Sequence, residues 1–157
     1  MRRPLRRNKD VNLHAASTLS AAAAELQGPI IRTSASVIGQ RDGESIIFAT
    51  TGWGYTVTVM MHAIRIGFEV RPRGWLRKSL HIAGAPADLV AEILDPDHHL
   101  RLLALHPMLV ELTPTGLRLE HKYGTDVTAA IHLAASIARR SREVQEKAAE
   151  HRFAVPA

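Results

Sequence analysis

Histidine is the side chain in this sequence that offers the most chemistry. Nine histidines are present, and His98, His99 and His106 lie close to Asp95 and Asp97 in one short segment. Imidazole and carboxylate groups are donors that zinc takes in proteins. However, no two histidines are four positions apart, the spacing that places two metal ligands on one face of a helix. The seven positions from His99 to His106 span about 10 Å of helix, which is too far for one ion. The sequence therefore predicts no metal site and no cofactor; the segment instead suits a helix with acid at its start and base at its end.

Catalytic motifs are missing elsewhere in the sequence. It contains no Gly-x-Ser-x-Gly elbow, no glycine-rich phosphate loop followed by lysine, no dinucleotide fingerprint and no cysteine. Between Leu26 and Asp88 the only acids are Asp42, Glu44 and Glu69. A pair of carboxylates for general acid and base catalysis is therefore not indicated. An enzyme without a recognisable motif stays open as an alternative.

Positive charge is concentrated in two short stretches. The chain carries a net charge of +5, and its first ten residues supply four of these charges, because five cations there oppose only Asp10. The second stretch, 71–78, interleaves four cations with Trp75. Cations beside an aromatic ring suit a phosphate with a stacked base, or a lipid headgroup. The candidate anion-binding residues are Arg2, Arg3, Arg6, Arg7, Lys9, Arg71, Arg73, Trp75, Arg77 and Lys78.

The elements that must position these residues follow from the periodicity of the apolar residues. The alanine-rich run 15–26 predicts a first helix. Alternating β-branched and aromatic residues predict five strands, within 31–37, 46–48, 55–59, 64–71 and 79–83. Helical periodicity then predicts short helices from about 85 and from 97, a hairpin of 108–112 with 117–121, and a long helix from Thr125 or Asp126 to about Glu150. The apolar stripe of this last helix consists of Val127, Ile131, Ala134, Ala135, Ile137 and Ala138. Beyond Arg139 the helix is rich in charge, so we expect its last turns to project into solvent or to contact a partner.

The predicted fold class is α+β. We expect an antiparallel β-meander, then two short helices, a β-hairpin and a long C-terminal helix packed on one face of the sheet. A chain of 157 residues with 46% hydrophobic content fits one domain. The predicted division is a flexible basic arm over 1–12, a single α+β domain over 13–150 and a tail over 151–157.

One stretch resembles known sequences. A strand ending at Gly84, the helix that follows it, the leucine-rich run 102–105 and the hairpin of 110–119 resemble uncharacterised bacterial α+β domains of unknown function, over about residues 64–140. The order of elements is also similar in part to pleckstrin-homology-like sandwiches and to secretion-chaperone-like domains. These resemblances imply a fold and no activity, because the order of elements does not convey function.

The composition indicates in which cellular compartment the protein resides and which classes of partner it could bind. A chain without cysteine suits a reducing cytoplasm, and no run of about 18 apolar residues predicts a membrane span. Three classes of function remain: a non-enzymatic protein-interaction or assembly module, an adaptor for nucleic acid or acidic lipid through the basic residues, and an enzyme. We favour the first, with a protein partner or a homo-oligomer, because the apolar strands and alanine-rich helix offer more surface than the short helices cover.

Overall fold

The computed structural model describes residues 5–73 and 79–153, and side chains over 13–73 and 79–151. In chain order the elements are α1 (Leu5–Glu25), β1 (Gln27–Arg32), β2 (Ser36–Arg41), β3 (Glu44–Thr50), β4 (Gly54–Met60), β5 (Gly67–Arg73), β6 (Ser79–Ala85), α2 (Ala87–Ile93), α3 (Pro96–Leu105), β7 (Leu109–Thr113), β8 (Gly116–Lys122) and α4 (Val127–Phe153). Within these residues no helix is both long and apolar enough to cross a membrane.

All eight strands belong to one antiparallel sheet in the order β1-β2-β3-β4-β8-β7-β5-β6. The predicted α+β class, with its long C-terminal helix, is confirmed. The meander is interrupted, however, because the β7–β8 hairpin inserts between β4 and β5. This pairing sets Leu119 opposite Val57 on one side and Val110 opposite Val70 on the other. All four of these side chains are buried, so the insertion completes the apolar middle of the sheet.

The prediction of one strand over 31–37 is wrong, because the chain turns at 33–35 and forms the β1–β2 hairpin. The hydroxyl of Thr33 accepts hydrogen bonds from the N–H groups of Ala35 and Ser36, at 3.3 and 3.0 Å. The Thr33 N–H donates to the Ser36 carbonyl at 2.9 Å. A threonine side chain therefore makes the turn that glycine or proline usually signals. The predicted strand over 64–71 also starts later, at Gly67.

The first helix begins ten residues before its predicted start. Its backbone is helical from Leu5, so it extends into the segment 1–12 that we predicted as a flexible arm. Leucine, arginine and lysine are good helix formers, so this segment can be helical without an apolar stripe. The predicted domain division stays a prediction.

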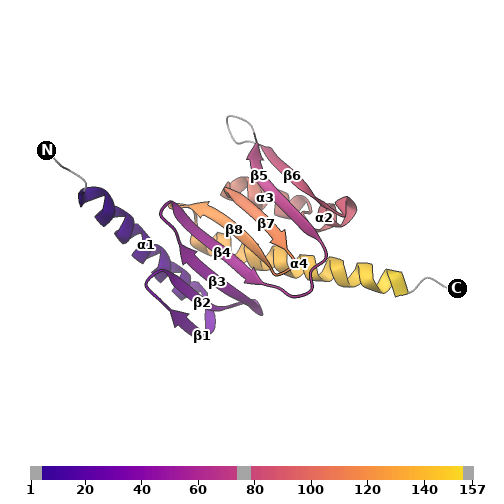
Figure 1. The fold of residues 1–157 in the computed structure, drawn as a ribbon, viewed down its shortest axis with the longest axis horizontal. Coiled ribbons are helices and arrows are strands. Elements are labelled where there is room, and N and C mark those ends of the chain that lie inside the picture. Colours follow the sequence, from indigo (N-terminus) through magenta and orange to yellow (C-terminus); the bar gives the residue numbers. More distant parts are fainter. Residues whose placement is uncertain (1–4, 74–78, 154–157) are drawn as a thin grey trace.

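The helices pack on one face of the sheet, and α4 runs behind the strands along much of its length (Figure 1). The apolar stripe predicted for this helix is buried, including Ile131, Ala134 and Ile137, except for the half-buried Val127. On β4 the residues alternate: Tyr55 and its i+2 neighbours are buried under the helices, while the threonines between them are half-buried on the open face. The first part of α4 therefore covers the sheet, and its last turns continue past the sheet beside α2.

Candidate functional site

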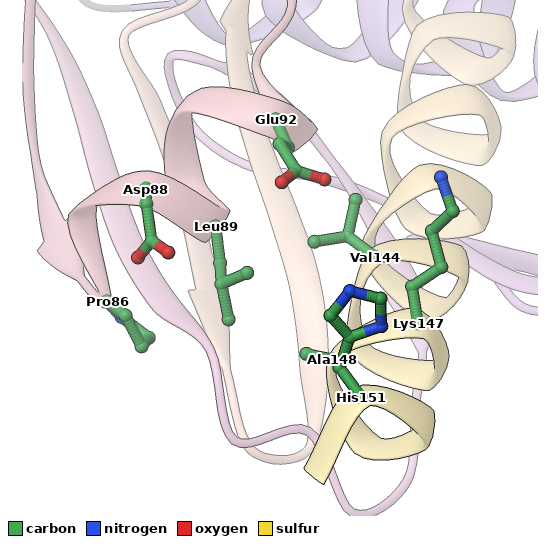
Figure 2. A pocket seen from close by; sticks show the side chains of 8 residues that line it. All are labelled: Pro86, Asp88, Leu89, Glu92, Val144, Lys147, Ala148 and His151. Carbon is green, nitrogen blue, oxygen red and sulfur yellow. The ribbon is translucent and has the colours of Figure 1, made fainter. Parts of the chain in front are cut away.

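A cavity lies between α2 and the last turns of α4. Its volume is about 520 Å³, and Figure 2 shows its lining, namely Pro86, Asp88, Leu89, Glu92, Val144, Lys147, Ala148 and His151. A second cavity of about 340 Å³ shares Pro86, Leu89 and Ala148 with the first and continues toward Ala63, Arg65 and Ile66. We call the two cavities together the α2–α4 groove.

The floor of the α2–α4 groove is apolar. On α4, Val144, Ala148 and His151 recur at spacings of four and three, so they share one face of the helix. Val144 is buried, and Ala148 is half-buried. Leu89 of α2 faces them and is also half-buried. The apolar residues of α2 and α4 that face the groove are thus not completely covered by the other helix.

The rim of the α2–α4 groove is charged. Asp88 and Glu92, one helical turn apart, give α2 an acidic edge, and Lys147 and His151 give α4 a basic edge. Figure 2 shows the Glu92 carboxylate and the His151 ring turned toward the space between the helices. All four of these side chains are exposed. A ligand in the groove would therefore meet apolar atoms below and charges of opposite sign on its two sides.

Polar contacts from α4 hold both walls of the α2–α4 groove. The Arg140 side chain donates through Nε to the Glu92 carbonyl at 3.1 Å, which ties the end of α2 to α4. The Gln145 amide accepts from the Arg65 N–H at 2.7 Å and donates to the Ala63 carbonyl at 2.8 Å. These bonds fix the loop between β4 and β5 against the helix. The groove is therefore shaped by side chains of α4 on both of its sides.

The structure gives the histidine segment a structural role. His98 is buried, and its ring nitrogens lie 2.8 Å from the Ile93 carbonyl and 2.7 Å from the Ser136 hydroxyl. Asp95, Asp97 and His98 bring potential metal donors within 4.8 Å of one another, but both nitrogens of His98 are already engaged by the protein. His98 therefore fastens α3 to α4, and His106 ends α3 in a left-handed conformation.

The candidate anion-binding residues fall partly outside the described residues. Arg2, Arg3, Trp75, Arg77 and Lys78 lie outside them, and Arg6, Arg7 and Lys9 lie on α1 where side chains are not described. Arg71 and Arg73 are exposed on β5, and Arg71 forms an ion pair with Glu69. β5 is near one end of the sheet, whereas α1 packs on β2 and β3 near the other end. The joint anion-binding site stays a prediction.

Three features of the structure do not follow from local sequence patterns. The α2–α4 groove depends on two helices that are distant in the chain. Trp53 is 82% exposed in the turn between β3 and β4. His121 is completely buried, and neither of its ring nitrogens has a hydrogen-bond partner. Burial lowers the pKa of this histidine from 6.5 to about 4.

Comparison with known proteins supports the fold. No protein-family model matches the chain, and no curated protein matches it. Among solved structures, the chain is similar to the crystal structure of the mycobacterial trehalose monomycolate transport factor A, TtfA. The TM-score is 0.53 and the sequence identity is 8%, and the match covers 87% of this chain and 94% of that chain. At this identity the similarity concerns the architecture alone.

Proposed function

We propose that this chain is a non-enzymatic protein-interaction module and that the α2–α4 groove receives its partner. The observation that carries the proposal is the continuity of the groove, since its two cavities meet at Pro86, Leu89 and Ala148. The architecture that this chain shares with the transport factor TtfA is compatible with a non-enzymatic role. The proposal places the module in the cytoplasm, as the absence of cysteine predicts.

The chemistry of the groove favours an amphipathic helix of another protein as the ligand. An apolar floor between two walls takes the apolar face of such a helix, with anchors repeating every three or four residues. The acidic edge at Asp88 and Glu92 suits cations on one flank of that helix. The basic edge at Lys147 and His151 suits acids on the other flank, so complementary charge would fix its direction.

A panel of helical peptides displayed on phage and selected on the full chain tests this proposal. Peptides that bind are then titrated by fluorescence anisotropy against Ala148→Glu, which places a charge on the groove floor, and against Leu100→Glu as the control. Leu100 is 67% exposed on α3 and lies outside the groove. We expect Ala148→Glu to weaken binding at least tenfold and Leu100→Glu to leave it unchanged.

Two outcomes would contradict the proposal. One is a selection that yields no peptide specific for the chain. The other is a set of peptides that bind wild type and Ala148→Glu equally well, because the ligand would then occupy another surface. Urea unfolding of both variants confirms that they are folded in the titration.

A further inference from the structure

The two edges of the sheet differ in how well they are protected against pairing with another strand. β1 contains Pro29, and its register against β2 shifts between Gln27 and Ile31. Proline and bulges are the usual means by which an edge strand avoids a new neighbour. β6 has neither feature, since it pairs with β5 in unbroken register from Ser79 to Ala85 and contains no proline or lysine. Among the described strands, β6 is therefore the open edge.

An apolar cavity runs beside this open edge. It has a volume of about 260 Å³, lies between β6 and α2, and is lined only by Ile82, Gly84, Ala87, Val90, Ala91 and Leu94. Ile82 pairs with the buried Val70 and so belongs to the face that the helices cover, yet 37% of its surface is exposed. The helical layer thus stops short of the edge and leaves part of the apolar face of β6 uncovered.

We propose that β6 pairs with β6 of a second copy of this chain, antiparallel and about a two-fold axis that passes through Ile82. Residue 82 is the middle of the seven-residue strand, so this register pairs the whole of β6. Ile82 then faces Ile82 of the second copy, and Leu80 faces Gly84 of the second copy. The result is one continuous sheet through both copies, with both helical layers on the same face.

Side-chain size in β6 fits this register. Gly84 has no side chain, and it lines the apolar cavity between β6 and α2. It leaves a gap in the apolar row of β6. In the proposed pairing the larger, half-buried Leu80 of the second copy lies opposite that gap. Because of the two-fold axis, Leu80 of each copy lies opposite Gly84 of the other.

Charge on the opposite face of the sheet fits as well. On β5, Arg71 is paired with His81 and Glu69 with Ala83. The proposed register sets His81 opposite Ala83 of the second copy, so each row across the interface runs from Arg71 of one copy to Glu69 of the other. Because Arg71 and Glu69 form an ion pair within each copy, these rows bring no net charge to the interface. A parallel pairing, by contrast, would bring like residues together along the whole edge.

This interface does not depend on the proposed function. It uses the side of α2 that carries Val90 and Leu94, whereas the α2–α4 groove uses the side that carries Asp88 and Leu89. A dimer formed through β6 thus leaves both copies of the groove open. Failure of either proposal leaves the other intact.

Single-cysteine variants test the register, because the natural chain has no cysteine. In the proposed dimer the two residues at position 82 are directly opposite, with Cα atoms about 4.5–5.5 Å apart, which is within the range of a disulfide. We expect mild oxidation of Ile82→Cys to give a disulfide-linked dimer at least ten times faster than Ile31→Cys. Ile31 is the control, since it is 61% exposed on the edge strand β1. Equal rates for the two variants would overturn the proposal.

Light scattering of the full chain gives an independent result. We expect wild type to form a dimer whose population rises with concentration, and Ile82→Lys and Ile82→Glu to be monomers when separate. Mixing these two variants should restore the dimer, because opposite charges then meet at the two-fold axis. A wild-type monomer at all concentrations, or a dimer that tolerates both charges separately, would overturn the proposal.

Discussion

The imidazole ring of His121 stacks on the phenol ring of Tyr55, with 5.3 Å between ring centroids, and both side chains are almost completely buried. Tyr55 donates from its hydroxyl to the Thr125 carbonyl at 3.1 Å, whereas neither nitrogen of His121 is hydrogen bonded. A protonated imidazole would have no partner in this environment. The charge state of His121 is therefore linked to folding.

The first prediction is that His121 makes the fold less stable in acid. Its pKa is about 4 in the folded chain and near 6.5 when the chain is unfolded. Between these two pH values the unfolded state binds a proton that the folded state does not. As the pH falls from 6.5 to 4, the free energy of unfolding therefore decreases by about 1.4 kcal/mol for each pH unit, and by roughly 3 kcal/mol in all. Urea unfolding from pH 7.5 to pH 4.5 measures this slope. The slope should become shallower in His121→Phe, and equal slopes in the two proteins would contradict the assignment.

The second prediction concerns the ion pair that joins α4 to the start of β3. Glu44 is buried, Arg142 contacts its carboxylate, and Arg142 also donates to the Met60 carbonyl at 3.2 Å. We expect Arg142→Met to lower the free energy of unfolding by about 2–3 kcal/mol, because a buried carboxylate then loses its partner. Adding Glu44→Gln should recover part of the loss. A double-mutant cycle in urea measures the coupling, and additive effects would show that the pair is not coupled.

The third prediction concerns the start of α3. Asp95 accepts a hydrogen bond from the His98 N–H at 2.9 Å, and this bond lowers the pKa of the Asp95 carboxyl below 3.8. We expect Asp95→Ala to cost about 1 kcal/mol, as is usual for a helix N-cap. The cost should be complete at neutral pH and should shrink as the pH falls below 3.8, since the folded state favours the ionised form.

Asp97 provides the matched control for that helix. It lies in the first turn of α3, and its side chain is 77% exposed. Asp97→Ala should change the free energy of unfolding by no more than about 0.5 kcal/mol, because it removes only an exposed ion pair with Arg101. Equal losses for the two variants in thermal or urea unfolding would argue against a capping role for Asp95.

The fourth prediction concerns Gln145 and the wall of the α2–α4 groove. Its side chain bonds both the Arg65 N–H and the Ala63 carbonyl. Gln145→Ala should expose these groups to water, so the amide of Arg65 should exchange its hydrogen about ten times faster. Amide exchange of β4, the control region, should stay unchanged. Unchanged exchange at Arg65 would show that the loop holds its shape without the side chain.

The sequence was sufficient for elements whose signals are local. The stripe that includes Ile131 and Ile137 predicted α4, and the alternation of Tyr55, Val57 and Val59 predicted β4. The turn at Thr33 was missed because a threonine hydroxyl makes its hydrogen bonds in place of glycine or proline. The predicted and observed elements thus differ where the hydrogen bonds of a single side chain determine the conformation of the backbone.

Features that depend on distant parts of the chain could not be predicted in the same way. β4 pairs with β8, which sets Tyr55 against His121 across 65 intervening residues, and no local pattern reports that choice. The α2–α4 groove arises in the same manner, from Leu89 and Ala148. Only the charged composition of the last helical turns indicated that this end of α4 projects toward solvent or a partner.

The position of α4 after the other described elements has a consequence for biosynthesis. This helix packs against α1, α2 and α3 and against strands of the sheet, yet it is synthesised after all of them. β4 meets its neighbour β8 only shortly before. The apolar face of the growing sheet therefore stays uncovered until α4 has been synthesised, and the nascent chain is most exposed to aggregation and to chaperone capture before that point.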